Sequence, residues 1–224
     1  MNDHGCLVTE SPSSRRTFGG RLVQLYSGLA LYGFATALRV RANLGLDPWG
    51  AFHQGVSETI GIKFGTAIIL VGAVILLLWI PLRQKPGLGT VSNIIVIGLA
   101  TDVALMVVPD AHSWLLQLLC LVAGTALTGF AGAAYMGAGL GTGPRDGLMM
   151  GIVARTNWPV QRVRAGIELT VLAAGWLLGG AVGWGTIIHA VLIGPVLDRS
   201  MQLLAALGLG QDRPAKKSAC STVD

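Results

Sequence analysis

Charged residues are scarce in this sequence. Asp, Glu, Lys and Arg together make up 12% of its 224 residues. Soluble globular domains carry about 25% charged residues, so this composition argues against a water-soluble protein. The apolar share of 52% and the mean hydropathy of +0.63 point the same way. We therefore expect an integral membrane protein whose surroundings are the lipid bilayer.

Catalytic and metal-binding motifs are also lacking. The three cysteines, Cys6, Cys120 and Cys220, are scattered and form neither a disulfide framework nor a metal-ligand spacing. The sequence contains no GxSxG, no HExxH and no Walker A lysine loop. It therefore predicts no catalytic residue, no metal and no cofactor, and we expect that the protein is not an enzyme.

The net charge of +5 does not indicate a nucleic-acid partner. The basic residues lie at the ends of apolar segments and form no stripe with interleaved aromatic residues. Residues 1–18 contain no apolar run, so no signal peptide is expected. We expect the basic residues to set the orientation in the membrane instead.

Six long apolar runs account for most of the chain. Each is close to the roughly 20 residues that a helix needs to cross a hydrocarbon core of about 30 Å. The sequence therefore predicts an all-α membrane protein with about six transmembrane helices. The runs are 22–38, 64–82, 88–108, 114–136, 163–182 and 184–207.

The charges of the short loops predict that both termini are cytoplasmic. Lys and Arg gather before the first run and after the second, fourth and sixth runs, and such loops stay inside. The loop over 39–63 disagrees, because Arg39, Arg41 and Lys63 would lie outside. Making segment 48–58 a full crossing fits worse, because it moves the basic residues that follow the second run to the outside.

The chain contains an internal repeat. Residues 22–102 align without a gap on residues 118–198, at a constant shift of 96 (118 − 22 = 96). Each copy has an odd number of predicted crossings, so the copies are expected to be inverted relative to each other in the membrane. The matched motifs are Leu44-Gly45-x-x-Pro48 with Leu140-Gly141-x-x-Pro144, and Gly87-x-Gly89-Thr90 with Gly183-x-Gly185-Thr186.

The predicted organisation has four parts. Each membrane repeat would contain three transmembrane helices and one short broken helix. The parts are a polar N-terminal tail over 1–20, a first repeat over 21–110, a second repeat over 113–207 and a polar C-terminal tail over 208–224.

A Gly/Pro-rich stretch interrupts each repeat at the matching place. Asp47-Pro48 and Gly143-Pro144 are typical helix starts, because Pro loses nothing at the first helical position. A helix of about eleven residues that ends before Gly61 would span ~16 Å, which is half a membrane. Such a helix is either re-entrant or interfacial, and the sequence leaves both open. The segments concerned are 48–58 and 144–155.

The two alternatives give these segments different roles. Two re-entrant helices would enter from opposite faces, and their N-termini would meet at a cavity and favour an anionic group. Arg145 would strengthen that preference, whereas Asp47 and Asp146 would oppose it or cap the helices. Two interfacial helices would be structural, with Trp49 and Trp158 as aromatic belt residues.

Polar residues inside the apolar runs are the other candidates for function, because charges in a membrane are costly. Glu168 forms either an intrahelical pair with Arg164 or a coupling site for a proton or cation. Asn93 and His189 are repeat partners, for which interhelical hydrogen bonds are the usual role, and His189 could also titrate near neutral pH. Asp102 and Asp198 are either gate contacts or helix ends that reach water. The candidate residues for a solute or a coupling ion are Asp47, Trp49, His53, Gln54, Asn93, Arg145, Asp146, Arg164, Glu168 and His189.

Nearly the whole chain, from about Arg21 to Leu207, resembles a known family. The motifs that carry the resemblance are Leu44-Gly45-Leu46-Asp47-Pro48-Trp49 with His53-Gln54-Gly55, Gly87-Leu88-Gly89-Thr90-Val91-Ser92-Asn93, and Gly141-x-Gly143-Pro144-Arg145-Asp146-Gly147-Leu148-Met149. Together they resemble the YczE branch of the YczE/YyaS/YitT membrane proteins of bacteria. The resemblance implies an integral protein of the bacterial cytoplasmic membrane, and it supplies no substrate.

The repeat and the broken segments favour a small secondary transporter or exporter of an unidentified, anionic small solute. The alternative is a membrane assembly or interaction factor that transports nothing and supports a partner enzyme. The expected partners are the lipid bilayer and the solute, and a homodimer stays open.

Overall fold

The computed structural model describes residues 17–210, and these residues form eight α-helices and no strand. The remainder of the predicted polar tails, with Cys6 and Cys220, lies outside the described residues. The helices are α1 (Phe18–Ala42), α2 (Pro48–Ile60), α3 (Phe64–Leu82), α4 (Leu88–Val107), α5 (Trp114–Gly137), α6 (Pro144–Thr156), α7 (Val160–Leu177) and α8 (Trp184–Ala206).

The helix boundaries follow the hydropathy and the turn residues of the sequence. The six long helices coincide with the six predicted apolar runs, and α2 and α6 coincide with the two predicted short segments. α2 begins with Pro48 at its first position and ends at Gly61, whose positive φ of 74° suits a residue without a Cβ. The four helices from α1 to α4 and the four from α5 to α8 begin 96 residues apart (114 − 18, 144 − 48, 160 − 64 and 184 − 88).

Four of the described helices are long and apolar enough to cross a membrane by length and composition, namely α3, α4, α5 and α8. The other two long helices, α1 with 25 residues and α7 with 18, carry several charged side chains. α1 nevertheless packs along α4 and α5, so it lies beside two helices that can span. The predicted number of six crossings therefore exceeds the four that composition alone supports.

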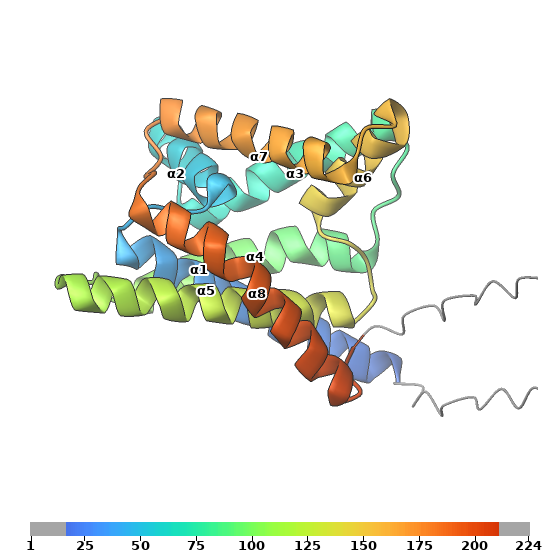
Figure 1. Cartoon of the computed structure of the whole chain (residues 1–224), viewed down its shortest axis with the longest axis horizontal. Helices are drawn as coiled ribbons and strands as arrows, with labels where there is room; N and C mark the ends of the chain where they lie inside the picture. Colours follow the sequence, from blue (N-terminus) through green and yellow to red (C-terminus); the bar gives the residue numbers. More distant parts are fainter. Residues whose placement is uncertain (1–16, 211–224) are drawn as a thin grey trace, which may run out of the picture.

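The helices form two layers (Figure 1). In one layer α1 packs against α5, with α4 against α1 and α8 against α5. In the other layer α2 packs against α7 and α3 packs against α6, so each short helix contacts a long helix from the other half of the chain. Small residues allow the helices to approach closely. Where α1 packs against α5, for example, a Cβ on Gly28 would lie 2.9 Å from the backbone nitrogen of Tyr135.

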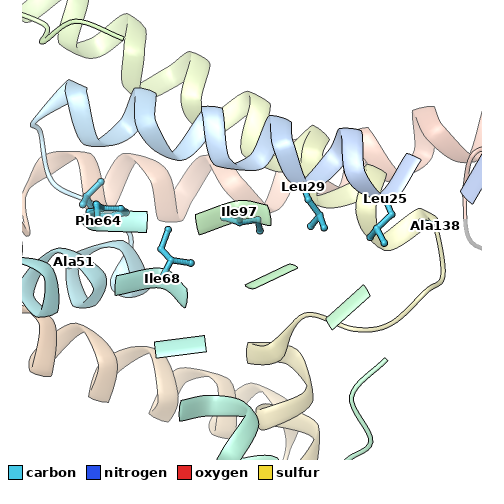
Figure 2. Close-up of a cluster of buried hydrophobic side chains, with 8 residues drawn as sticks. Leu25, Leu29, Ala51, Phe64, Ile68, Ile97 and Ala138 are labelled. Atoms are coloured by element: carbon cyan, nitrogen blue, oxygen red, sulfur yellow. The ribbon is translucent and has the colours of Figure 1, made fainter. Parts of the chain in front are cut away.

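A hydrophobic core connects the layers (Figure 2). Leu25 and Leu29 of α1 face the same interior as Phe64 and Ile68 of α3 and Ile97 of α4. Burial of such side chains in lipid gains little from water exclusion, so close packing holds these helices together. The core leaves one large space open between the layers.

Candidate functional site

A cavity of about 760 Å³ lies between the two layers, and all eight described helices contribute residues to its lining. This volume falls within the range of small-molecule sites, roughly 300–1,000 Å³. Most of its wall is apolar, with isoleucine and leucine side chains from α3, α4 and α7. Polar residues are confined to a few positions, so each is a candidate for contact with a bound molecule.

The N-termini of the two short helices meet in this cavity. The Arg145 guanidinium of α6 lies 3.9 Å from the Asp47 carboxylate that precedes α2. It also lies over the Trp49 ring, 4.7 Å from the ring centroid. Trp49 is thus a buried residue of the cavity wall. The alternative prediction, an aromatic belt residue at the membrane surface, is wrong for Trp49.

Asp47 does not cap α2, contrary to one prediction. Its side chain makes no capping hydrogen bond, although the residue occupies the N-cap position. Instead, Arg39 Nη1 donates a hydrogen bond to Asp47 Oδ1 at 2.5 Å, and the two side chains are 4% and 14% exposed. A buried guanidinium is strongly destabilising without a carboxylate partner, which explains why Asp47 turns toward Arg39.

Ion pairs also hold two of the three basic residues that disagreed with the charge rule for loops. Arg39 and Arg41 belong to the last turn of α1 rather than to a loop. Arg41 Nη1 donates to Asp110 Oδ1 at 2.6 Å, so each arginine has a carboxylate partner. Both arginines thus lie at the end of a helix and within reach of a carboxylate.

Two equivalent sets of hydrogen bonds hold the segments that lead into the short helices. Before α6, Gly89 N donates to Leu140 O at 2.9 Å and Thr90 Oγ1 donates to Thr142 O at 2.7 Å. Before α2, Gly185 N donates to Leu44 O at 2.7 Å and Thr186 Oγ1 donates to Leu46 O at 2.7 Å. We call these two sets the reciprocal clamps.

The reciprocal clamps explain the paired motifs. The start of α4 holds a segment of the second half, and the start of α8 holds the matching segment of the first half. The glycines are required by contact, since a Cβ on Gly89 would lie 3.0 Å from Leu140 O and one on Gly185 would lie 2.7 Å from Gly45 O. The clamps thus fix where α2 and α6 begin.

The cavity brings together nine of the ten predicted solute or coupling residues, although their roles stay predictions. Gln54 is the exception: its Nε2 donates to Glu58 Oε1 and its Oε1 accepts from Ala181 N, away from the cavity. The nine residues that line the cavity are Asp47, Trp49, His53, Asn93, Arg145, Asp146, Arg164, Glu168 and His189.

The predicted intrahelical pair of α7 is present. Arg164 Nε donates to Glu168 Oε1 at 3.1 Å, and the side chains are 66% and 43% exposed. Because both residues also line the cavity, the pair lies at its edge and not in its interior. This pair therefore differs from the enclosed pair of Arg39 and Asp47.

The uncharged polar residues of the cavity differ in whether their side chains have hydrogen-bond partners. His189 Nδ1 and Thr125 Oγ1 share a hydrogen bond of 3.1 Å between α8 and α5, as predicted for an interhelical contact. Asn93 and His53 line the cavity and are at least nine-tenths buried. Within residues 17–210 neither side chain has a hydrogen-bond partner, so the predicted interhelical bond of Asn93 is absent there.

The two gate candidates lie away from the cavity. Asp102 Oδ1 accepts a hydrogen bond of 2.7 Å from Gly65 N, which fastens the start of α3 to α4. Asp198 is exposed and makes no ion pair with another described residue. No group of three or more His, Cys, Asp or Glu side chains within residues 17–210 is arranged to hold a metal ion.

Residues 20–202 match a family described as "Family of unknown function (DUF6198)". The chain belongs to the DUF6198 family. It is 37% identical over 185 residues to the "Uncharacterized membrane protein YczE" of Bacillus subtilis, which covers 80% of this chain and 86% of the relative. An "Uncharacterized protein" of Haemophilus influenzae is 36% identical over 184 residues, which covers 82% and 84%.

The "Uncharacterized protein YyaS" of Bacillus subtilis is 25% identical to this DUF6198 chain over an alignment of 190 residues, which covers 83% of the chain and 94% of the relative. The predicted resemblance to the YczE and YyaS proteins is therefore confirmed, and the chain is a membrane protein. No solved structure matches it.

Two residues of the site in this DUF6198 chain, Arg39 and Tyr135, are not among the candidates predicted from the sequence. Tyr135 lines the cavity from α5, and Arg39 fixes Asp47 at the cavity wall. The two occupy matching positions in the chain (135 − 39 = 96). The signal for Arg39 was its disagreement with the charge rule, because an arginine on the wrong side of a membrane usually has a partner.

Proposed function

We propose that the protein is a small secondary transporter or exporter of the bacterial cytoplasmic membrane that moves a small anionic solute through the cavity. The meeting of α2 and α6 carries this proposal. Their first residues converge on Arg145, and neither helix start has a side-chain cap. Free backbone N–H groups beside a guanidinium attract an anion.

The charges around the cavity agree with an anionic solute. Asp47 is already paired with Arg39, and Glu168 is paired with Arg164. Arg145 holds Asp47 only at 3.9 Å, which is longer than a hydrogen bond. Asp146 lies in the first turn of α6, where the helix dipole stabilises it. Arg145 therefore keeps hydrogen-bond donors available for a solute.

Six crossings in two inverted repeats are part of the proposal. The packing supports it, because the contacts occur in pairs that the repeat relates. The contact of α1 with α4 in the first half matches that of α5 with α8 in the second. The contact of α2 with α7 matches that of α6 with α3. In this arrangement α1 and α7 cross beside the four apolar helices, α2 and α6 are re-entrant, and both termini are cytoplasmic.

Metabolite profiles of cells with and without the protein test the proposal. We expect deletion to change the level of an anionic solute, and Arg145→Ala to reproduce the change of the deletion. Arg162→Ala is the matched control, since Arg162 is an exposed arginine of α7 that does not line the cavity. Immunoblots of membranes establish that the variants accumulate equally.

An unchanged profile after deletion would sink the transporter proposal. The alternative, a membrane assembly factor without transport, would then be favoured if the loss of the protein lowered the amount of a partner complex. No chemical conversion is proposed for the cavity, so the solute should leave unaltered.

A further inference from the structure

The contact between α3 and α4 is closed by small residues. A Cβ on Gly98 of α4 would lie 2.6 Å from the carbonyl oxygen of Gly65 of α3. Two turns further along α3, a Cβ on Gly72 would lie 2.7 Å from the side chain of Ile94. The two helices therefore touch backbone to backbone and leave no passage between them.

The matching helices, α7 and α8, are not among the packed pairs of the described helices. At the residues that correspond to Gly65, Ile69 and Gly72, polar side chains replace the two glycines and a smaller side chain replaces the isoleucine. They are Gln161, Ala165 and Glu168. Gly194 corresponds to Gly98, but a Cβ on it would meet nothing within 4 Å. Figure 1 shows that α8 diverges from α7 beyond the loop that joins them.

The cavity reaches the surface through this gap. Leu169 of α7 and Val191 of α8 both line the cavity, yet they are 66% and 67% exposed. A side chain with both properties lies at the rim of an opening. Because α8 is apolar enough to span a membrane, this rim faces the hydrocarbon of the bilayer and not bulk water.

A charged pair stands at the same opening. Glu168 lies near the middle of α7 and Arg164 one turn nearer its start, and both line the cavity and remain partly exposed. Charges at that depth are costly unless they contact polar groups or water. Asn93 and His53 lie further inside, without hydrogen-bond partners among the described residues. Polar groups thus continue from the opening to Arg145.

We propose that the gap between α7 and α8 is a lateral portal, and that the solute is an amphiphile with an anionic head group and an apolar tail that enters from the bilayer. This inference rests on the proposed transport function and names its substrate class. The head group contacts Arg145 and Asn93. The tail lies along the apolar wall of Ile68, Ile75, Ile94, Ile97, Ile167 and Leu172.

Filling the portal tests this inference. Gly194→Trp adds an indole to α8 one turn from the rim residue Val191, and no clash is expected, because a Cβ on Gly194 would meet nothing within 4 Å. Gly166→Trp is the matched control, because Gly166 of α7 also has nothing within 4 Å, is exposed and does not line the cavity. The full chain is reconstituted in phosphatidylcholine nanodiscs, and circular dichroism verifies the fold of each variant.

Binding is measured for two probes with the same head group, dodecyl phosphate and the short butyl phosphate. Because a plug in an entrance slows entry without changing the contacts of the bound molecule, we expect Gly194→Trp to slow the association of dodecyl phosphate about tenfold or more, and Gly166→Trp to leave the rate unchanged. Butyl phosphate, whose short tail has little need of the portal, should bind both variants equally. Gly194→Leu provides a second, smaller plug if the tryptophan variant does not fold.

Phosphatidic acid in the nanodisc identifies the source of the amphiphile. Competition with dodecyl phosphate assigns the natural solute to membrane lipids, and lack of competition assigns it to free amphiphiles. Both outcomes keep the portal.

Three results would overturn the inference. One is an equal association rate of dodecyl phosphate with wild type and with Gly194→Trp. Another is binding of butyl phosphate alone, which would leave an anion transporter standing without a portal. The third is a crosslink between Cys residues introduced on α7 and α8 of two copies, because a second copy would then cover the gap.

Discussion

The two halves of the molecule share their helix boundaries and their clamps, but they differ in how two helices meet. In the half from α1 to α4, glycines seal α3 against α4. In the half from α5 to α8, the corresponding face of α7 carries Gln161 and Glu168, and α8 stands away from it. The closed contact thus has glycines at two positions where the open one has a polar or charged side chain.

The ion pairs of the two halves differ in the same sense. The pair of Arg39 and Asp47 is enclosed, whereas the pair of Arg164 and Glu168 is exposed at the edge of the cavity. A buried pair is fixed by the cost of leaving either charge alone, and an exposed pair is free to exchange its partner. We therefore assign a structural role to the first pair and an adaptable one to the second.

The largest expected effect comes from breaking the enclosed pair. Asp47→Asn leaves the Arg39 guanidinium buried without a counter-charge, and we expect a loss of about 3–5 kcal/mol in the free energy of unfolding. The measurement is unfolding of the purified protein in detergent, followed by circular dichroism. Asp198→Asn, at an exposed aspartate, is the control and should unfold like wild type. Equal stability of the two variants would contradict the structural role.

An intermediate effect is expected at the closed contact of α3 and α4. Gly65→Leu forces the helices apart, because a Cβ there would lie 2.7 Å from Asp102 Cγ. Overpacking of this kind should remove about 1–3 kcal/mol from the free energy of unfolding. The matched substitution in the open half, Gln161→Leu, should change it by less than about 0.5 kcal/mol, since surface positions tolerate substitution. A similar loss in both variants would mean that the two contacts do not differ.

The smallest effect on stability is expected at the exposed pair. Glu168→Gln should change the free energy of unfolding by less than about 1 kcal/mol, which is the range of exposed ion pairs. The same unfolding assay gives the value. Arg164→Gln and the double variant complete a double-mutant cycle, whose coupling term should be equally small. A loss as large as that of Asp47→Asn would show that α7 is sealed against α8 in the folded protein.

The helices could be predicted from the sequence because their boundaries depend on local properties. Apolar runs of membrane length define the six long helices, and Pro48 and Gly61 mark the ends of α2 without reference to any other segment. Nine of the ten candidate residues line the cavity, because polar groups in apolar runs face inward and the two short helices begin at the cavity.

The contacts between distant segments could not be predicted in this way. Asp47 has the sequence of a helix cap, and only the fold brings Arg39 close enough to compete for its carboxylate. The spread of α8 away from α7 depends on which side chains face each other across two helices. The sequence aligns Glu168 with Gly72. The effect of this difference on helix packing depends on α4, because Ile94 of α4 packs against Gly72.

The reciprocal clamps carry a consequence for biosynthesis. The hydrogen bonds that fix the segment before α2 come from Gly185 and Thr186, at the start of α8. α8 is the last helix that the ribosome delivers among the described residues. The last contacts of the first short helix are therefore made only after α8 has been synthesised, and a nascent chain that stops before α8 has no finished cavity.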